Sequence, residues 1–350
     1  MSINKVLYVG RHLRPYRLNF LRAISENFEL RLMVESGSEL LDQWTASNTY
    51  TYKNLVMRDV EGFRSKIPNL YFSPGLYWGL LKSDVDVVIF EGTSLSFFIA
   101  SLIMRIKGVK IIISFERTLH TERYNKWYRI KFHKILLKIL AHGILANGIE
   151  TEKYLKSIDR KALIYTRNVF PDIPQINKTL NRDYDILFVG QLIHRKGYRY
   201  LLELVEFVSK NKELKICIVG DGYFYSELKN RTYGRENIEL IKKLNYQDVL
   251  KKMNESKFLF LPTLEDNWSL VTFEAAINGC VPITTKYNGA LDGDVFDASN
   301  SIQYDFESDF WEKHWNNLRC EKRWKRLSEN CRNLVYLKIY GDLKRYLQCF

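Results

Sequence analysis

The sequence predicts an α/β protein made of two Rossmann-like domains. Short apolar runs rich in β-branched residues alternate with helical patterns along most of the 350 residues. Strands that are apolar on both faces belong to parallel sheets covered by helices. A segment with two prolines and little apolar periodicity interrupts this alternation near the middle, and the pattern then restarts. The break predicts two domains rather than one.

The first domain is expected at residues 1–170, and residues 18–28 show an amphipathic helical pattern within it. Its predicted strands are 5–10, 29–34, 85–91, 109–116 and 142–147. A linker is expected at 171–183, followed by the second domain at 184–325. The strands predicted there are 184–190, 213–222, 237–241, 257–262 and 281–285. Residues 326–350 are expected to be helical and to pack back on the first domain.

Charge and cysteine content narrow the class of protein. The chain has 53 Lys and Arg against 40 Asp and Glu, a formal net charge of +13. This excess favours anionic partners, namely nucleic acid, acidic lipid headgroups or phosphorylated small molecules, although a merely solubilising charge is the alternative. The five cysteines show no CxxC spacing, which indicates a reducing compartment and neither a disulfide framework nor a zinc site.

The chain is expected to be soluble and cytoplasmic. Its first residues, "MSINKVLYVGR", are typical of a strand rather than a signal peptide. The longest apolar stretch, at 94–104, is shorter than the roughly 20 residues that a membrane-spanning helix needs.

The stretch "FVGQLIHRKG" predicts an anion site. A strand ends at Gly190, a basic loop follows, and a helix opens near Gly197. Ligands of such sheets bind at the carboxyl ends of the strands, and a helix start offers free N–H groups. Arg195 and Lys196 add two positive charges, so the arrangement suits a diphosphate; a solvated basic loop is the alternative.

The stretch "TLEDNWSLVTFEAAINGCVPI" at 263–283 places two acids around a helix start. Asp266 lies in the loop before the helix, and Glu274 lies about one turn inside it. The helix is expected to be closed by Gly279. Carboxylates accept hydrogen bonds from vicinal hydroxyls, so this pair beside a phosphate-binding helix start suits a nucleotide sugar. The alternative is that Asp266 or Asn267 caps the helix and Glu274 is an ordinary surface residue.

Two further segments follow strands. The "GDG" within 219–230 is a weak signal that favours a tight turn. Basic residues crowd the loop after the first strand, which suggests that an anionic group binds there; a solvated loop is again the alternative. These candidates are Arg11, His12, Arg14 and Arg17, with Tyr16 among them. "DVD" (84–86) and "DGD" (292–294) are interpreted as caps or turns, so no metal site is predicted.

Together these segments resemble the GT4 family of GT-B glycosyltransferases, which are retaining enzymes that use nucleotide-diphosphate sugars. The resemblance covers most of the chain and is strongest at 184–290, where "FVGQLIHRKG", "IVGDG" and "LEDNWSLVTFEAAINGCVPITTKYNGA" follow the family's order. It implies two domains facing across a cleft. "RPYRLNFLRAI" is similar to the family's acceptor-binding loop, which implies an acceptor-side role for Arg11, Arg14, Tyr16 and Arg17.

The resemblance also implies roles for single residues. Asp266 and Glu274 match the two acids of the family's E-x7-E motif, the first near the reacting carbon of the donor sugar and the second at the ribose. Lys196 matches the phosphate-binding lysine. Residues 268–270 (Trp268, Ser269 and Leu270) match those whose amides hold the diphosphate.

The chain departs from the family's pattern at two donor-site positions. Asp266 is a methylene shorter than the usual glutamate. Gln191 stands where the family has an arginine, which leaves Arg195 as a candidate for that charge. In the first domain, Glu116 and His120 are both candidates for the family's residue near the anomeric carbon.

The implied reaction is a front-face hexosyl transfer that requires neither a cofactor nor a metal ion. The expected acceptor is a glycan or a lipid-linked hydroxyl in cell-surface polysaccharide or lipopolysaccharide synthesis. The basic amphipathic stretch 122–140 suits an anionic membrane surface, or alternatively covers the sheet of the first domain. Nucleotide-sugar epimerisation is the alternative enzyme class. Nucleic-acid binding is suggested only by the net charge, and because no RNA or DNA motif is present, no nucleic-acid partner is expected.

Overall fold

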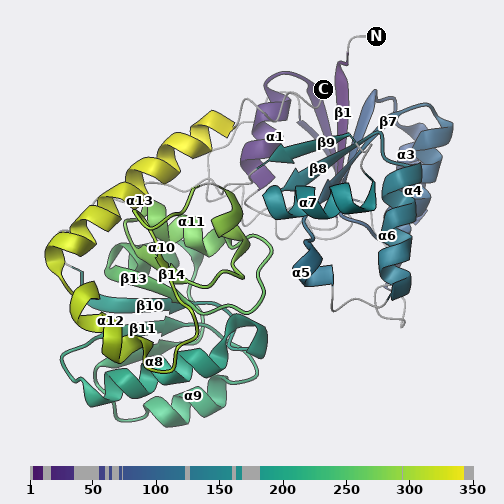
Figure 1. The fold of residues 1–350 in the computed structure, drawn as a ribbon. Coiled ribbons are helices and arrows are strands. Elements are labelled where there is room, and N and C mark those ends of the chain that lie inside the picture. The colour runs from purple at the N-terminus through teal and green to yellow at the C-terminus, as the bar shows by residue number, and fades with distance from the viewer. Residues whose placement is uncertain are drawn as a thin grey trace. The chain divides into compact units, whose positions relative to one another are not determined.

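The computed structural model describes residues 3–10, 17–34, 55–59, 63–64, 71–72, 74–122, 127–159, 163–167, 182–293 and 295–342. The chain divides into two compact units, residues 1–172 with 341–350 and residues 173–340 (Figure 1). Most of the expected linker therefore lies outside the described residues. Each unit contains one parallel sheet with helices packed against it (Figure 1).

The first unit is built on a seven-stranded sheet of order β3-β2-β1-β6-β7-β8-β9, in which every described pairing is parallel. Its strands are β1 (Lys5–Gly10), β2 (Glu29–Val34), β3 (Leu55–Asp59), β6 (Val87–Glu91), β7 (Lys110–Phe115), β8 (Gly143–Asn147) and β9 (Ile164–Arg167). A separate two-stranded antiparallel ladder joins β4 (Phe63–Arg64) to β5 (Tyr71–Phe72).

Helices cover both faces of this sheet, because its central strands are apolar on both sides. Helix α1 (Leu18–Ser25) packs on one face through Phe20, Leu21 and Ile24. The other face is covered by α3 (Pro74–Lys82), α4 (Leu95–Ile106), α6 (Trp127–Ile139) and α7 (Ile149–Ile158). The one-turn helix α5 (Leu119–Glu122) follows β7.

The second unit has a six-stranded parallel sheet of order β12-β11-β10-β13-β14-β15. Its strands are β10 (Tyr184–Val189), β11 (Ile216–Val219), β12 (Ile238–Ile241), β13 (Ser256–Leu261), β14 (Val281–Thr284) and β15 (Ile302–Gln303). The α-helices are α8 (Tyr198–Lys210), α9 (Tyr225–Thr232), α10 (Tyr246–Asn254), α11 (Leu270–Ile277), α12 (Phe310–Leu318) and α13 (Glu321–Asp342). Two 3-10 helices, η2 (His194–Lys196) and η3 (Gly289–Gly293), lie in the loops after β10 and β14.

All ten predicted strands are confirmed, with ends that differ by at most a few residues. The predictions missed β3, β9 and β15, which lie at sheet edges, and the separate short pair β4 and β5. Edge strands bury less surface, so they are short and mix polar with apolar residues instead of forming a continuous apolar run. The helix expected at 18–28 ends earlier, at Ser25.

The described cysteines are free thiols. Cys217, Cys280 and Cys331 are buried and Cys320 is exposed. Burial raises the pKa of the Cys217 and Cys280 thiols to about 12, so both remain protonated. No helix within the described ranges is both long and apolar enough to span a membrane.

Candidate active site

The candidate site of the second unit lies beside β10, from which the chain connections run to opposite sides of the sheet. Strand β10 is central, with β11 on one side and β13 on the other. The loops after β10 and β13 therefore emerge side by side at the carboxyl edge of the sheet, which is the usual ligand position in such folds. The backbone amide of Leu264 donates to the Arg195 carbonyl at 2.9 Å. The Arg195 guanidinium in turn donates to the Glu265 carbonyl at 2.8 Å.

An ion pair between Lys196 and Asp266 joins these two loops. The side chains are only 18% and 13% exposed, so each charge is largely removed from bulk water. A charge in such a position needs a partner of opposite sign, and Lys196 and Asp266 are each other's partner. The structure thus brings together the residue predicted for phosphate and the residue predicted for the donor sugar, which are 70 positions apart.

Gly197 allows the basic loop to approach β13 closely. Its φ of +78° lies in the left-handed region, and a Cβ there would sit 1.9 Å from the Pro262 carbonyl oxygen. Only glycine satisfies both conditions without strain. Helix α8 then begins at Tyr198, as predicted.

The loop that carries Asp266 is held by the segment after β14. The Asp266 amide donates to the Tyr287 carbonyl at 3.1 Å, and the Asp266 carbonyl accepts from the Gly289 amide at 2.8 Å. Asn288 is fully buried and donates through Nδ2 to Thr272 and Thr284, each at 2.9 Å. This buried support was not predicted, because no local pattern links an asparagine in a loop to hydroxyls on two other elements.

Helix α11 starts at Leu270 and ends at Ile277, followed by Gly279 at φ +71°, as predicted. Its N-cap is Ser269, whose side chain makes no capping hydrogen bond. The alternative in which Asp266 or Asn267 caps this helix is therefore wrong. Trp268 is buried and stacks on Phe273 with ring centroids 5.2 Å apart, which fixes the path into the helix.

Glu274 is partly buried within α11 and forms a hydrogen bond with Tyr246 of α10. Burial raises the pKa of its carboxyl to about 7, and the Tyr246 bond opposes that rise. The description of Glu274 as an ordinary surface residue is therefore wrong. Tyr246 was missed in the sequence because it lies 28 positions away on another helix.

The loops after β10 and β11 also lie against each other. The Leu192 amide donates to the Asp221 carbonyl at 2.9 Å, and a Cβ on Gly220 would meet the Gly190 carbonyl oxygen at 1.9 Å. The "GDG" segment fits against this loop only because Gly220 has no side chain, and the turn itself follows it, with the Tyr225 amide donating to the Gly222 carbonyl at 3.1 Å. Gln191, at the start of the β10 loop, is exposed.

In the first unit, Arg11, His12, Arg14 and Tyr16 lie outside the described residues. Arg17 is 1% exposed, so its side chain is not part of a solvated basic loop. It pairs with Glu91 at the end of β6, with Nε 2.8 Å from Oε1, and also with Glu116 just after β7. The Tyr8 hydroxyl donates to Glu91. These contacts collect carboxylates at the carboxyl edge of the first sheet.

The two candidates near β7 differ in their surroundings. Glu116 keeps 31% of its side chain exposed while Arg17 holds it. His120 is partly buried in α5. Glu122, at the end of the same turn, is buried beside His133, with 3.7 Å between carboxylate and imidazole, and accepts from Arg117 at 3.2 Å.

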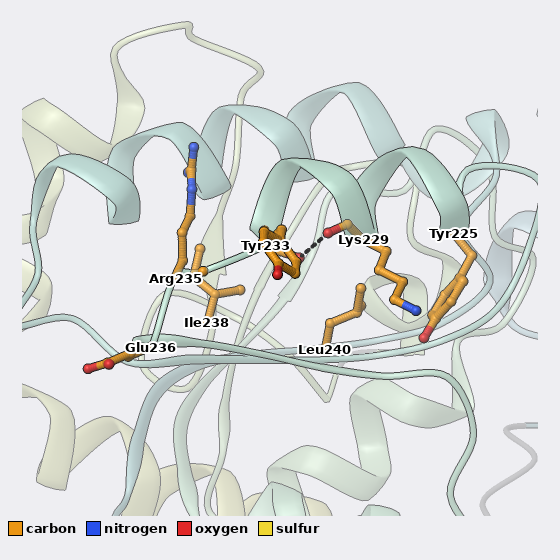
Figure 2. A pocket seen from close by; sticks show the side chains of 9 residues that line it. Tyr225, Lys229, Tyr233, Arg235, Glu236, Ile238 and Leu240 are labelled. Carbon is orange, nitrogen blue, oxygen red and sulfur yellow. Dashed lines mark hydrogen bonds between the residues drawn. The ribbon is translucent and has the colours of Figure 1, made fainter.

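Elsewhere, the described residues form a groove but no candidate metal site. No three His, Cys, Asp or Glu side chains there converge at metal-binding distance. An open groove of about 410 Å³ lies between α9 and β12 (Figure 2) and shares no lining residue with the candidate site. Its rim includes Tyr225, Lys229, Tyr233 and Arg235.

Comparison with known proteins identifies relatives over both the sequence and the fold. Residues 169–293 match the sequence model of the family described as glycosyl transferases group 1. The capsular polysaccharide biosynthesis glycosyltransferase CapH of Staphylococcus aureus is 24% identical over 204 residues. The match covers 52% of this chain and 54% of CapH, so it spans about half the length of that relative.

Solved structures share the fold over nearly the whole chain. HepE of Anabaena in complex with UDP and glucose has a TM-score of 0.76 at 12% identity, covering 99% of this chain and 97% of HepE. S. aureus TarM in complex with fondaparinux, alpha-GlcNAc-glycerol and UDP has a TM-score of 0.76 at 11% identity, covering 99% of both chains. A glycosyltransferase from Rickettsia africae has a TM-score of 0.72 at 15% identity, covering 99% of this chain and 97% of its own.

These matches confirm the resemblance inferred from the motifs. The chain has the GT-B fold of two Rossmann-like domains, and its residues 169–293 match the sequence model of the glycosyl transferases group 1 family.

Proposed function

We propose that this protein is a retaining, GT4-like glycosyltransferase. It moves a sugar from a nucleotide-diphosphate sugar to a hydroxyl of a glycan or lipid-linked acceptor. The observation that carries the proposal is the Lys196–Asp266 pair beside the start of α11. A cation for phosphate, a carboxylate for sugar hydroxyls and the N-terminus of a helix meet at one edge of the sheet.

Each part of the donor has a matching group in this arrangement. The diphosphate would bind Lys196 and the first-turn amides of α11, with Arg195 adding charge nearby. The ribose hydroxyls would bind Glu274, and the donor hexose would bind Asp266. HepE structures contain UDP, UDP with glucose, or UDP-glucose, which supports a uridine-diphosphate sugar as the first donor to test.

Donor binding would replace the Lys196–Asp266 ion pair by contacts with the donor. In the structure Lys196 and Asp266 neutralise each other. When the donor binds, the diphosphate takes over the Lys196 ammonium, and the sugar hydroxyls take over the Asp266 carboxylate. Neither charge is left buried without a partner at any stage, which keeps the cost of opening the pair small.

The transfer then breaks the bond between the anomeric carbon and the diphosphate oxygen while the acceptor oxygen attacks from the same face. The acceptor proton passes to the departing phosphate oxygen, so no strong side-chain base is required. Positive charge at Lys196 stabilises the negative charge that develops on the leaving diphosphate. We expect turnover to be unchanged by a chelator, since this charge comes from the protein.

The first unit supplies the acceptor side in this proposal. Glu116, partly exposed and held by Arg17, is the carboxylate best placed to accept a hydrogen bond from an acceptor hydroxyl. The role of CapH in capsular polysaccharide biosynthesis supports a cell-surface glycan as acceptor class. A lipid-linked acceptor of that class would be met at the cytoplasmic face of a membrane.

The test is to incubate the purified chain with a labelled uridine-diphosphate sugar and a membrane extract. Labelled sugar should appear in lipid or polymer, with the anomeric configuration of the donor conserved in the product's proton coupling constant. An inverted product would refute the retaining mechanism. Isomerised donor without any acceptor would point to epimerisation, and an unchanged donor would contradict both activities.

A further inference from the structure

Three neighbouring helices of the first unit expose an unusual combination of apolar and basic side chains. Helices α3, α4 and α6 cover the same face of the sheet (Figure 1). Nine of the thirteen large apolar side chains that are exposed in the described part of the chain lie on them. They are Trp78, Leu81, Leu95, Leu102, Ile106, Trp127, Tyr128, Ile135 and Ile139. We call these three helices the α3–α4–α6 face.

This exposure is substantial, and in the described part of the chain most of it falls on three helices of one unit. Ile106 is 86% exposed and Trp127 is 74% exposed. Isolated exposed apolar residues need no explanation, but a gathering over adjacent helices marks an interaction surface.

The charges on the α3–α4–α6 face have one sign. The sequences of the three helices contain no Asp and no Glu. Their exposed cations, together with the residue that follows α4, are Lys82, Arg105, Lys107, Lys131, Lys134 and Lys138. The acids next along the chain are already engaged, because Asp84 pairs with Lys5 and Asp86 accepts from the backbone amides of Asn4 and Lys5.

Helix α7, on the same side of the same sheet, provides an internal comparison. It carries Glu150 and Glu152 in its first turn, and both are paired with lysines of that helix, at Lys153 and Lys156. A helix that merely covers the sheet can thus have mixed, self-neutralised charge. The absence of acids from α3, α4 and α6 is therefore not a requirement of covering this sheet.

The three helices are also fixed to one another. The Lys107 ammonium donates to the carbonyls of Leu80, Leu81 and Ser83 at 2.6–2.9 Å, which ties the start of the loop after α4 to the end of α3. Phe98 of α4 and Phe132 of α6 are in ring contact, with centroids 5.4 Å apart. The face is therefore preformed and requires no folding on contact.

We propose that the α3–α4–α6 face binds the surface of an anionic lipid bilayer. Trp127 and its apolar neighbours would enter the boundary between headgroups and acyl chains, while Lys131, Lys134 and Lys138 would meet lipid phosphates. A net-positive, acid-free surface is complementary to such a membrane and unfavourable for a second copy of itself. The inference concerns a partner of the first unit and holds whether or not the second unit transfers sugar.

The experiment is co-sedimentation of the full chain with vesicles of equal parts phosphatidylglycerol and phosphatidylcholine, and with pure phosphatidylcholine vesicles. Wild type should bind the anionic vesicles, lose binding as salt is raised and bind the neutral vesicles weakly. Each lysine near an anionic surface contributes about a fivefold change in affinity. The variant Lys131→Gln, Lys134→Gln, Lys138→Gln should therefore bind about 100-fold more weakly.

Two further variants separate this surface from overall charge. The triple variant Lys210→Gln, Lys212→Gln, Lys229→Gln removes the same charge from exposed positions of the second unit and should bind like wild type. Trp127→Ala should weaken binding about tenfold while leaving its salt dependence unchanged.

Three results would overturn the inference. They are equal loss in the two lysine variants, no binding of wild type to anionic vesicles, or a wild-type dimer that the Lys131, Lys134 and Lys138 variant converts to monomer. Nucleotide binding measured on the same proteins should be unaffected by either lysine variant, so a failure of this inference is distinguishable from a failure of the proposed activity.

Discussion

Replacing Glu274 by glutamine should make the protein more stable at neutral pH while weakening donor binding. In the folded chain the pKa of this carboxyl is raised from 4.5 to about 7 by burial. Between these two pH values the folded state holds a proton that the unfolded state has released. Stability from this group is therefore present below pH 4.5 and is lost as the pH rises towards 7.

The magnitude follows from the same two values. The difference between a pKa of 4.5 and one of about 7 corresponds to about 3 kcal/mol of unfolding free energy. Glutamine resembles the protonated acid in shape and charge and can still accept the hydrogen bond from Tyr246. Glu274→Gln should thus match wild type near pH 4.5 and exceed it by about 3 kcal/mol above pH 7. In a unit of this size that is a rise of about 6–12 °C in melting temperature.

The assay is thermal unfolding of the full chain from pH 5 to pH 8, following the transition that UDP shifts. Glu213→Gln, at an exposed position of the same unit, is the matched control and should leave the pH profile unchanged. UDP-glucose binding should weaken about 10–100-fold in Glu274→Gln, because a hydrogen bond to a charged acceptor is lost. A stability difference from wild type that is the same at pH 5 and pH 8 would refute this reasoning.

Other substitutions test the supporting structure. Gly197→Ala should destabilise the second unit by about 2 kcal/mol or more, because the left-handed backbone is strained and the new Cβ collides with Pro262. The control Gly234→Ala, at φ +71° with no atom within 4 Å of the new Cβ, should destabilise it by only about 1 kcal/mol. Equal melting temperatures for the two variants would contradict this explanation. Arg17→Met should destabilise the first unit by about 3–5 kcal/mol in urea unfolding, since Glu91 and Glu116 lose their shared cation. If the variant unfolded at the same urea concentration as wild type, the ion-pair network would be dispensable for stability. Lys196→Met should weaken UDP binding in calorimetry about 10-fold or more, whereas unchanged affinity would remove this residue from the diphosphate site.

The sequence predicted the parallel sheets and the donor-site segments because these are local patterns. A doubly buried strand shows as an apolar run, and Gly197 and Gly279 mark the start and end of helices that the structure confirms. The sequence was less informative about the features that depend on contacts between distant elements. The pairing of Lys196 with Asp266, the burial of Glu274 against Tyr246 and the support from Asn288 arise only when separate βα units pack together. Arg17 was expected in a basic loop, and only the topology reveals Glu91 and Glu116 beside it.

Turnover of the Asp266→Asn variant is the most direct test of the proposed site. Asparagine has nearly the same shape as aspartate but lacks the charge that Lys196 and the donor sugar would share. Nucleotide-diphosphate release from UDP-glucose, or from the donor that best stabilises wild type in a thermal-shift screen, should be measured with membrane extract as acceptor. We expect at least about a 100-fold slower release in the variant, with UDP affinity changed only a few-fold. Release at the wild-type rate would contradict the proposed role of Asp266.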